Sequence, residues 1–408
     1  MSEAFQPDLY DYDFECNPVP TLNRLRAEDP VHRSRHGFWY LTRYDDVVSV
    51  LQDTKRFSSA AAGFGTSAVS KPAGQVSGEE KSFNRSLAAS FNQMDPPDHT
   101  RIRLLVNSAF SRRQVEERRG RILQVIGELI DGMKRKPRFD LVTDFAFHLP
   151  IIVASEIIGI PTADRERFRV AFEESAVLLA PKRSEESWAK GLASVKWVGS
   201  YIRELIAERR REPKDDLLTA LIAAEEQGSR LSEAEMSSAI STIYTAAGTT
   251  TERMISSGLF ILLSHPEQWA AVKADRALIA GAVEEILRFH HPLQSTTTNR
   301  RATEDVTMRG KTIAAGETVR VGLGAANRDP DKFPDGDRFD IRRRPSVPIL
   351  SFGTGPHFCI GSALARFEGQ LALEAIAQHL PDIRLITTAP VKDPRRTDRY
   401  HEILATAA

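Results

Sequence analysis

The sequence predicts a mainly α-helical fold with a small β portion. Three long segments, 113–134, 184–211 and 360–380, carry apolar side chains at intervals of three and four residues, with Arg, Glu or Lys between them. Short alternating runs punctuated by glycine, at 31–44 and 306–321, predict strands. No clear linker separates these segments, so we expect residues 1–408 to form a single domain.

The composition is typical of a globular protein, and its balanced charge does not favour a highly charged binding partner. Hydrophobic residues make up 41% and charged residues 27% of its 408 residues, which excludes a disordered or coiled-coil chain. The 55 basic and 55 acidic residues balance, so no long-range field favours nucleic acid or an anionic membrane. The N-terminus lacks a signal-peptide pattern, and no apolar run reaches the ~20 residues of a membrane helix. We therefore expect a cytoplasmic protein that binds neither nucleic acid nor membrane.

A long helix is expected between Ser232 and Pro266. Ser232 and Glu235 have the spacing of a capping box at its start. Its middle, residues 246–251 (AAGTTT), places a glycine and three β-branched residues where a buried helix usually carries Ala or Leu. This weak point predicts a backbone bulge and the close approach of another group.

A shorter helix is expected at 281–292 (GAVEEILRFHHP), where Pro292 ends the pattern. Glu285 and Arg288 are three residues apart and share one face of this helix. Taken alone, such a pair is most often a solvated surface pair.

The most informative segment is 351–373, in which Cys359 follows a glycine-rich run and precedes a strong helical pattern. Cys359 is therefore expected at a helix N-terminus, where backbone N–H groups and the helix dipole stabilise a thiolate. The glycines would let the backbone approach a flat ligand, which favours a haem iron held by cysteine. A metal site of His357, Cys359, His290 and His291 is an alternative, although adjacent ligands of this kind fall short of the usual zinc pattern.

Residues 352–361 (FGTGPHFCIG) match every fixed position of the pattern FGxGxHxCxG, and on this ground the sequence resembles the cytochrome P450 family. Further motifs follow the order and spacing of the soluble bacterial members of that family: 95–103 (DPPDHTRIR), Ala247-Gly248 with Thr251, Glu285 with Arg288, and 327–330 (NRDP) with Phe333-Pro334. The resemblance covers residues 20–408 and leaves 1–19 as an N-terminal extension.

The resemblance implies a single-domain cytochrome P450 fold, with haem b between the long central helix and the helix that follows the cysteine. Cys359 would be the axial ligand of the iron. The haem would be contacted by Phe352, Gly353, Ala247 and Gly248. Its propionates would accept hydrogen bonds from four basic side chains: His99, Arg103, Arg300 and His357.

The resemblance also implies that Glu285 and Arg288 are buried with a third arginine. Arg338 fits this role best, with Arg343 and Arg328 as rivals. Such a network would be structural, because breaking one partner of a buried ion pair costs ~3–5 kcal/mol.

The expected oxygen site departs from the family pattern. The residue before the threonine is usually Asp or Glu in this family, and here it is Thr250. Thr251 and Thr250 are the catalytic candidates, with protons passing through Thr250 and water or coming from Glu252, about 100° round the helix. Alternatively, the threonine hydroxyls only bond the carbonyls of the preceding turn.

Because of this departure, other haem chemistries stay open beside monooxygenation. They are a haem-thiolate peroxygenase, a nitric-oxide-reductase-like enzyme and a non-catalytic haem-binding protein. No basic cluster that would hold a nicotinamide cofactor is evident over the distal loops, which counts against the nitric-oxide-reductase-like enzyme.

No glycine-rich dinucleotide fingerprint follows a strand, so electrons are expected from another protein. The resemblance implies a ferredoxin or flavodoxin with its reductase, docking on the cysteine side. Arg112, Arg113 and 342–344 could supply positive charge there, although such runs are more often solvated surface. The expected reaction is hydroxylation or O-dealkylation of a small apolar organic substrate by a monomeric enzyme. Candidate pocket walls are 57–94 with Arg85 and Ser86, 162–212, the helix around Tyr244 and Thr245, and 293–298.

Overall fold

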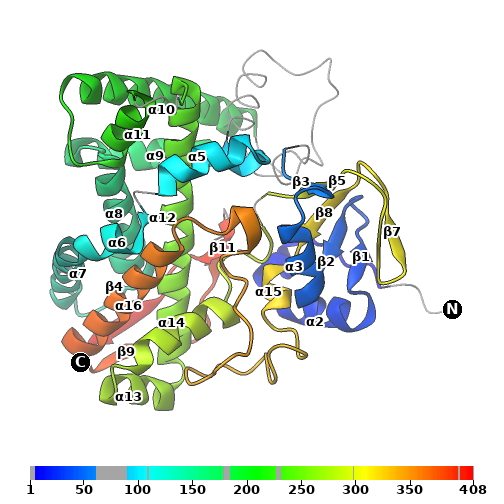
Figure 1. The fold of residues 1–408 in the computed structure, drawn as a ribbon. Coiled ribbons are helices and arrows are strands. Elements are labelled where there is room, and N and C mark those ends of the chain that lie inside the picture. Colours follow the sequence, from blue (N-terminus) through cyan, green and yellow to red (C-terminus); the bar gives the residue numbers. More distant parts are fainter. Residues whose placement is uncertain are drawn as a thin grey trace.

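The structure is a computed structural model of the chain and describes residues 5–60, 90–107, 110–176, 178, 184–226, 231–296, 298–393 and 396–407. Helices gather on one side of the molecule and the largest sheet on the other (Figure 1). The helices of the helical side are α5 (Asp98–Asn107), α6 (Arg112–Glu117), α7 (Arg119–Lys134), α8 (His148–Ile158), α9 (Arg165–Ala176), α10 (Glu185–Arg211), α11 (Leu217–Glu226), α12 (Glu233–Leu263), α13 (Pro266–Ala274), α14 (Leu278–Phe289) and α16 (Ser362–His379). The other α-helices are α1 (Tyr12–Cys16), α2 (Val19–Glu28), α3 (Tyr44–Gln52) and α15 (Leu323–Ala326), and the short helices of other types are η2 (Phe91–Gln93), η4 (Val142–Ala146), η5 (Thr162–Asp164) and η7 (Gly355–His357).

The helix α12 passes through the middle of the helical side and contacts α8, α14 and α16 (Figure 1). The capping box at its start is confirmed, because Ser232 and Glu235 each accept a hydrogen bond from the other's backbone N–H. The expected bulge is wrong: α12 is helical without interruption from Glu233 to Leu263. Gly248 instead allows α8 to approach closely, since a Cβ atom at Gly248 would lie 3.3 Å from Ile151 Cγ1.

The largest sheet has the strand order β1-β2-β8-β5-β3. Its strands are β1 (Val31–Arg33), β2 (Trp39–Leu41), β8 (Thr318–Val321), β5 (Arg300–Ala302) and β3 (Phe57–Ser58). In β5, Arg300 and Ala302 are buried and Arg301 is exposed, as the alternation of a strand requires. At the edge of the sheet, β3 pairs antiparallel with β5, with Ser58 opposite Arg301.

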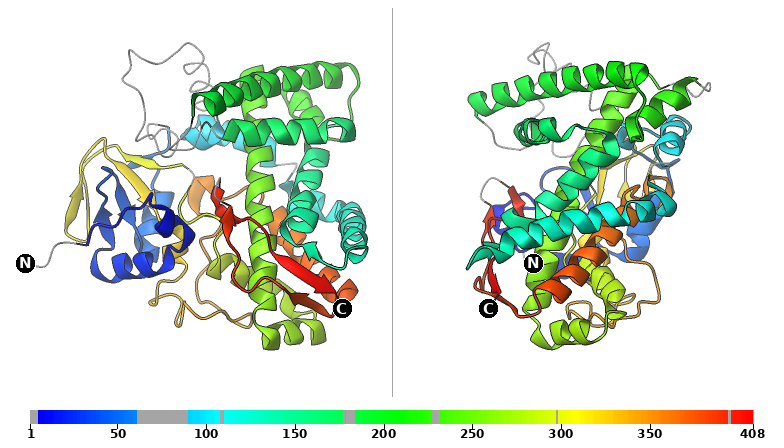
Figure 2. Two further views of the ribbon diagram at one scale, coloured as in Figure 1. Left: turned by 180° about the vertical axis from the view of Figure 1, so that it is seen from behind. Right: turned by 90° about the vertical axis from the view of Figure 1, so that its left-hand side faces the viewer.

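The smaller sheets hold distant parts of the chain together. They are β6 (Val306–Met308) with β7 (Lys311–Ile313), β10 (Lys392–Asp393) with β11 (Arg396–Tyr400), and β4 (Phe139–Asp140), β12 (Leu404–Ala407) and β9 (Ile383–Leu385) in the order β4-β12-β9. Strands β9 and β11 run beside α12 (Figure 2). Residues 139–140 form a short strand because Asp140 pairs with Leu404 near the other end of the chain.

The predicted helices at 184–211, 281–292 and 360–380 are confirmed as α10, α14 and α16. The segment 113–134 is two helices, α6 and α7, which meet at Arg118. The strand segments 31–44 and 306–321 are confirmed as β1 with β2 and as β6, β7 and β8.

A buried ion network fixes α14 against the chain that leads to the cysteine. Glu285 and Arg288 are 3% and 1% exposed and are joined by two hydrogen bonds of 2.7 Å. The third arginine is Arg343, whose Nε lies 3.3 Å from the Glu285 carboxylate, so the expectation for Arg338 is wrong. Arg338 contributes only its carbonyl oxygen, and Arg328 pairs with Asp337 instead. The side chain of Asn327, whose own carbonyl binds Arg288, accepts from the Leu350 N–H and donates to Ser351.

The N-terminal extension packs on the largest sheet from residue 5 onward. Arg320 of β8 donates to the Tyr10 hydroxyl at 3.0 Å, and Leu9 is buried in a small cluster with Leu22 and Phe38. Among the helices in the described part of the chain, none combines the length and the apolar composition that a bilayer crossing requires.

Candidate active site

The cysteine loop is a closed turn that leads into α16. The Cys359 N–H donates to the Phe352 carbonyl at 2.9 Å, which closes residues 352–359 into a loop. Gly353 and Gly355 have φ angles of +66° and +73°, which favour glycine. A Cβ atom at Gly355 would lie 2.5 Å from the Leu51 carbonyl oxygen, so the glycine also allows α3 to approach. These contacts place Cys359 just before the N-terminus of α16, as expected.

Several groups act on the Cys359 thiol. Burial raises its pKa, while the amide of Gly361, the guanidinium groups of Arg103 and Arg366 and the amide of Ser362 act in the opposite direction. The amides at the helix N-terminus therefore lower the pKa of Cys359, as expected, but burial raises this pKa by more. Arg366 also lies over the Phe352 ring at 4.3 Å and forms an ion pair with Glu284.

A cluster of basic side chains lies beside this loop. The rings of His99 and His357 are 4.0 Å apart between centroids, and both come from segments that the sequence singled out. Burial lowers the pKa of His99 to about 4, that of His357 to about 2 and that of Arg300 to about 10. Arg103 donates to the Phe358 carbonyl and so links α5 to the cysteine loop.

The donors of this cluster are only partly used by the chain. Neither ring nitrogen of the buried His99 has a partner among the described residues, and neither does Nε of Arg300. Arg300 Nη1 donates to the carbonyls of Thr298 and Asn299 at 3.1 and 3.2 Å. His357 Nε2, in contrast, lies 3.2 Å from Ser59 Oγ. Buried donors without acceptors are costly, so His99 and Arg300 point to an acceptor that the described residues do not provide.

The three threonines of α12 differ in how their hydroxyl groups are used. The hydroxyl groups of Thr249 and Thr250 donate to the carbonyls of Thr245 and Ala246 at 2.9 and 2.7 Å. These two threonines therefore bond the preceding turn, as the sequence allowed. The hydroxyl of Thr251 makes no hydrogen bond with any other described residue, and Thr251 is 5% exposed. Of the three, Thr251 alone has its hydroxyl proton uncommitted among these residues.

The remaining site candidates differ in how far they are buried, and two of them lie outside the described residues. Gly248 and Glu252 are buried in α12, and Ala247 is partly exposed. Tyr244 packs against Phe168 at 4.8 Å and is 4% exposed, whereas Thr245 is exposed. Arg85 and Ser86, with residues 61–89 of the expected pocket wall, lie outside the described residues. In the described part of the chain, no three His, Cys, Asp or Glu side chains gather as a metal site would need, which leaves the zinc alternative without support.

Comparisons with known proteins agree on one family. The family model of Cytochrome P450 matches residues 35–381. Cytochrome P450 107B1 of Saccharopolyspora erythraea is 40% identical over 392 residues, which are 94% of this chain and 93% of the relative. The cytochrome P450 monooxygenase PikC of Streptomyces venezuelae is 39% identical over 380 residues, which are 91% and 86% of the two chains. The solved structure of the bacillaene polyketide synthase cytochrome P450 PksS of Bacillus subtilis has a TM-score of 0.86 at 33% identity and covers 99% of this chain and 100% of that one.

The chain therefore belongs to the cytochrome P450 family. It is a haem-dependent monooxygenase whose cofactor is haem b. The site fits this cofactor, because haem carries two propionate carboxylates and the buried donors of His99 and Arg300 require acceptors.

Ser59 and Asp95 were not identified from the sequence as residues that contact the segments of the basic cluster. Ser59 contacts His357, and Asp95 accepts hydrogen bonds from the Ser59 backbone and the Ser58 hydroxyl. Asp95 lies in the motif 95–103 and could have been noted as the residue that precedes α5. Ser59 lies in a stretch rich in Ala, Gly and Ser, which gives no comparable signal.

Proposed function

We propose that Cys359 would bind the haem iron through its sulfur and that His99, Arg103, Arg300 and His357 would hold the propionates. The free donors of His99 and Arg300 beside the cysteine loop are the observation that supports this assignment most strongly. Phe352 and Gly353 would contact the haem from the loop, and Ala247 and Gly248 from α12. In this proposal residues 1–408 work as one domain.

When bound, haem supplies the activation of dioxygen and the transfer of one oxygen atom to the substrate. Thr251 offers a proton at Oγ1, because its hydroxyl is not used by the preceding turn. Thr250 replaces the family's acid, and its hydroxyl donates to the Ala246 carbonyl, so it acts as an acceptor that orders water. The proton that replenishes Thr251 then comes through water or from the buried Glu252.

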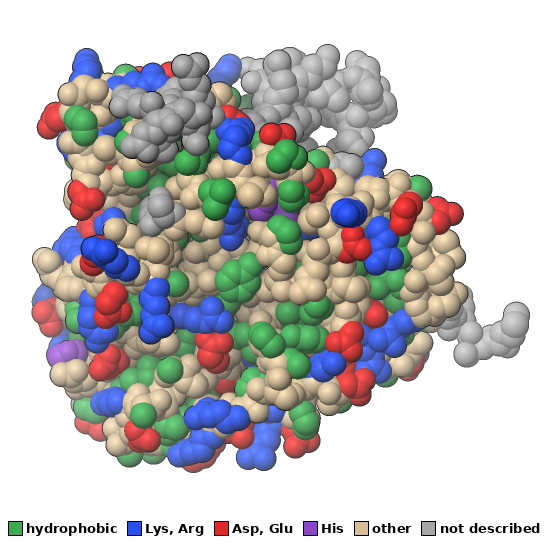
Figure 3. All heavy atoms as spheres, in the orientation of Figure 1, with side chains coloured by type: hydrophobic (Ala, Val, Ile, Leu, Met, Phe, Trp, Pro, Cys, Tyr) green, Lys and Arg blue, Asp and Glu red, His purple; other side chains and the backbone are tan. Residues whose placement is uncertain are grey.

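The electron donor in this proposal is a ferredoxin or flavodoxin with its reductase, docking on the cysteine side. Leu104 and Phe358 are 66% and 41% exposed next to Arg103, which suits a small docking patch. Arg343 does not contribute to it, since its side chain belongs to the Glu285 network. Positive and negative side chains are intermingled over the face in Figure 3, so docking would depend on local contacts more than on a broad field.

The substrate in this proposal is a small, mainly apolar organic molecule that is hydroxylated or O-dealkylated by a monomeric, cytoplasmic enzyme. The relatives support an organic substrate, since one of them is named as part of a polyketide synthase. Ligand pockets of this kind are mostly apolar, with a few polar groups that set orientation.

The ligand assignment is tested by the absorption spectrum of the reduced, carbon-monoxide-bound protein. We expect the strongly red-shifted Soret band of a thiolate-bound haem, and we expect Cys359→Ser to abolish it. Arg366→Ala is the control, because it changes the charge near the sulfur without removing it. An unchanged band in Cys359→Ser would refute the assignment.

A peroxide-driven reaction is the second candidate, favoured by the absence of an acid at Thr250. Thr251→Ala should raise the peroxide released per product in the oxygen-driven reaction, and Thr250→Asp should lower or preserve it. Equal peroxide release by Thr251→Ala and the parent would remove Thr251 from the mechanism. Product formation with hydrogen peroxide alone, at the rate of the complete system, would favour the second candidate.

A further inference from the structure

The Ser58–Ser59 segment at the end of β3 contacts all three segments that carry the basic cluster. Its strand pairs with β5, where Arg300 begins the strand. Ser59 Oγ lies 3.2 Å from Nε2 of His357 in the cysteine loop. Asp95, which lies shortly before α5, accepts from the Ser59 N–H at 2.8 Å and from the Ser58 hydroxyl at 2.5 Å. The segment is therefore a junction between β5, the cysteine loop and the start of α5.

Asp95 connects this junction to His99 as well. Its backbone carbonyl accepts from the His99 N–H at 3.0 Å, so the residue that anchors Ser59 also begins the helical turn that carries His99. Ser59 is fully buried and His99 is 1% exposed, so these hydrogen bonds are shielded from water. The carboxylate of Asp95 also opposes the effect of burial on the pKa values of Arg300 and His99.

The Ser59 hydroxyl and a hydrogen bond with the Met94 backbone together hold the ring of His357, which packs against the ring of His99. The two histidine rings are 4.0 Å apart and tilted by 35°. The ring of His99 itself makes no hydrogen bond with the described residues. A rotation of His357 would therefore move the unpaired nitrogens of His99.

We propose that Ser59, anchored by Asp95, is a positioning residue that orients the His357–His99 pair for the haem propionates. The inference rests on the proposed propionate role of these histidines. Ser59 does not touch the haem in this proposal, because it acts through the His357 ring.

This role is tested by measuring how fast the holoenzyme loses haem to an excess of apomyoglobin. Removing one buried hydrogen bond by Ser59→Ala should speed haem loss about fivefold. Ser59→Thr keeps the hydroxyl and should restore the parent rate. The propionate bending bands in the resonance Raman spectrum should shift in Ser59→Ala and return in Ser59→Thr, which a change in stability alone would not cause.

Thr303→Ala is the control, because it removes a hydroxyl that joins the residue after β5 to the chain just before β3. Thr303 Oγ1 donates to the Lys55 carbonyl at 2.7 Å, away from the histidines. Its rate of haem loss should equal that of the parent. Equal acceleration in Thr303→Ala and Ser59→Ala, or a parent rate in Ser59→Ala, would overturn the proposal.

A double-mutant cycle tests whether Ser59 acts through His357. His357→Phe keeps a ring against His99 but removes the nitrogen that Ser59 contacts. In that background Ser59→Ala should change the rate less than twofold. A full fivefold effect there would assign Ser59 to another partner and refute the positioning role. A parent that lacks the thiolate-type carbon-monoxide band would refute the haem site itself, which keeps the two failures distinct.

Discussion

The structure contains two buried clusters of charged and basic side chains, and the described residues satisfy their hydrogen bonds to different degrees. Glu285 has two arginines, Arg288 and Arg343, and the backbone N–H of Asp340 around its carboxylate. His99 and Arg300 leave buried nitrogens without partners in the described part of the chain. The first cluster carries its own acceptors, whereas the described residues leave part of the second cluster open for acceptors from a ligand.

The difference separates residues that serve the fold from residues that serve the cofactor. A saturated network is destabilised by losing any member, since the partner charge is then left buried. An unsaturated cluster costs stability until its ligand arrives, so removing a member should stabilise the protein without ligand and weaken binding. The opposite signs give the comparison a direct test.

Breaking the saturated network should have the largest effect. Glu285→Ala leaves Arg288 without its carboxylate, and the free energy of unfolding should fall by ~3–5 kcal/mol. Haem content after purification should fall with it. Glu284→Ala removes a partly exposed ion pair on the same helix and should cost less than ~1 kcal/mol in urea unfolding. Similar losses for the two variants would contradict the distinction.

Glu368 provides a third case, a buried carboxyl with which no cation of the described residues forms an ion pair. It is 2% exposed, and burial raises its pKa to about 8. The folded state therefore holds a proton that the unfolded state loses, and stability should decrease as the pH rises from about 5 to 8. Glu368→Gln should flatten this decrease and raise the free energy of unfolding by ~2 kcal/mol at pH 8. Identical pH profiles of parent and variant would show that Glu368 is ionised in the fold.

Removing a member of the unsaturated cluster should act in two directions. We expect Arg300→Met to raise the unfolding free energy of the apoprotein by ~1 kcal/mol, because an incompletely bonded buried charge is lost. Haem release from the holoenzyme should become about tenfold faster. Arg301→Met, on the exposed face of the same strand, should change neither quantity. A destabilised apoprotein would place Arg300 with the structural network.

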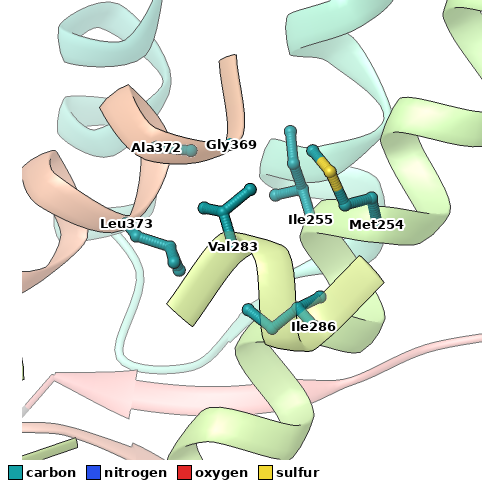
Figure 4. A pocket seen from close by; sticks show the side chains of 7 residues that line it. All are labelled: Met254, Ile255, Val283, Ile286, Gly369, Ala372 and Leu373. Atoms are coloured by element: carbon teal, nitrogen blue, oxygen red, sulfur yellow. The ribbon is translucent and has the colours of Figure 1, made fainter. Parts of the chain in front are cut away.

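A packing change away from both clusters should have the smallest effect and set the baseline. Gly369 of α16 lines a small apolar pocket with Met254 and Val283 (Figure 4). A Cβ atom there would lie 2.8 Å from the end of the flexible Met254 side chain, which can shift into the pocket. Gly369→Ala should therefore stabilise the protein by ~0.5 kcal/mol through helix propensity. A loss above ~1 kcal/mol in thermal unfolding would mean that Met254 cannot move.

Local patterns predicted most of the fold because they depend on near neighbours. The capping box at Ser232 and the strands within 31–44 and 306–321 depend on residues within one turn or a few pleats. The bulge in α12 was predicted from the low propensity of 246–251 and is wrong, because packing against α8 overrides propensity there. The strand at Phe139–Asp140 was missed because its partner is at the other end of the chain.

By itself, the sequence determined the order of the helices, the cysteine loop and the residue types that could hold a haem, since periodicity and motif spacing act over a few residues. Only the tertiary structure decided that Arg343 completes the Glu285 network, 58 residues away, and that Ser59 meets His357, 298 residues away. Hydrogen bonds depend on the distance and angle between side-chain ends, and those are set by how strands pair and loops reverse. The same reason explains why the unpaired donors of His99 and Arg300 emerged only once the chain was folded.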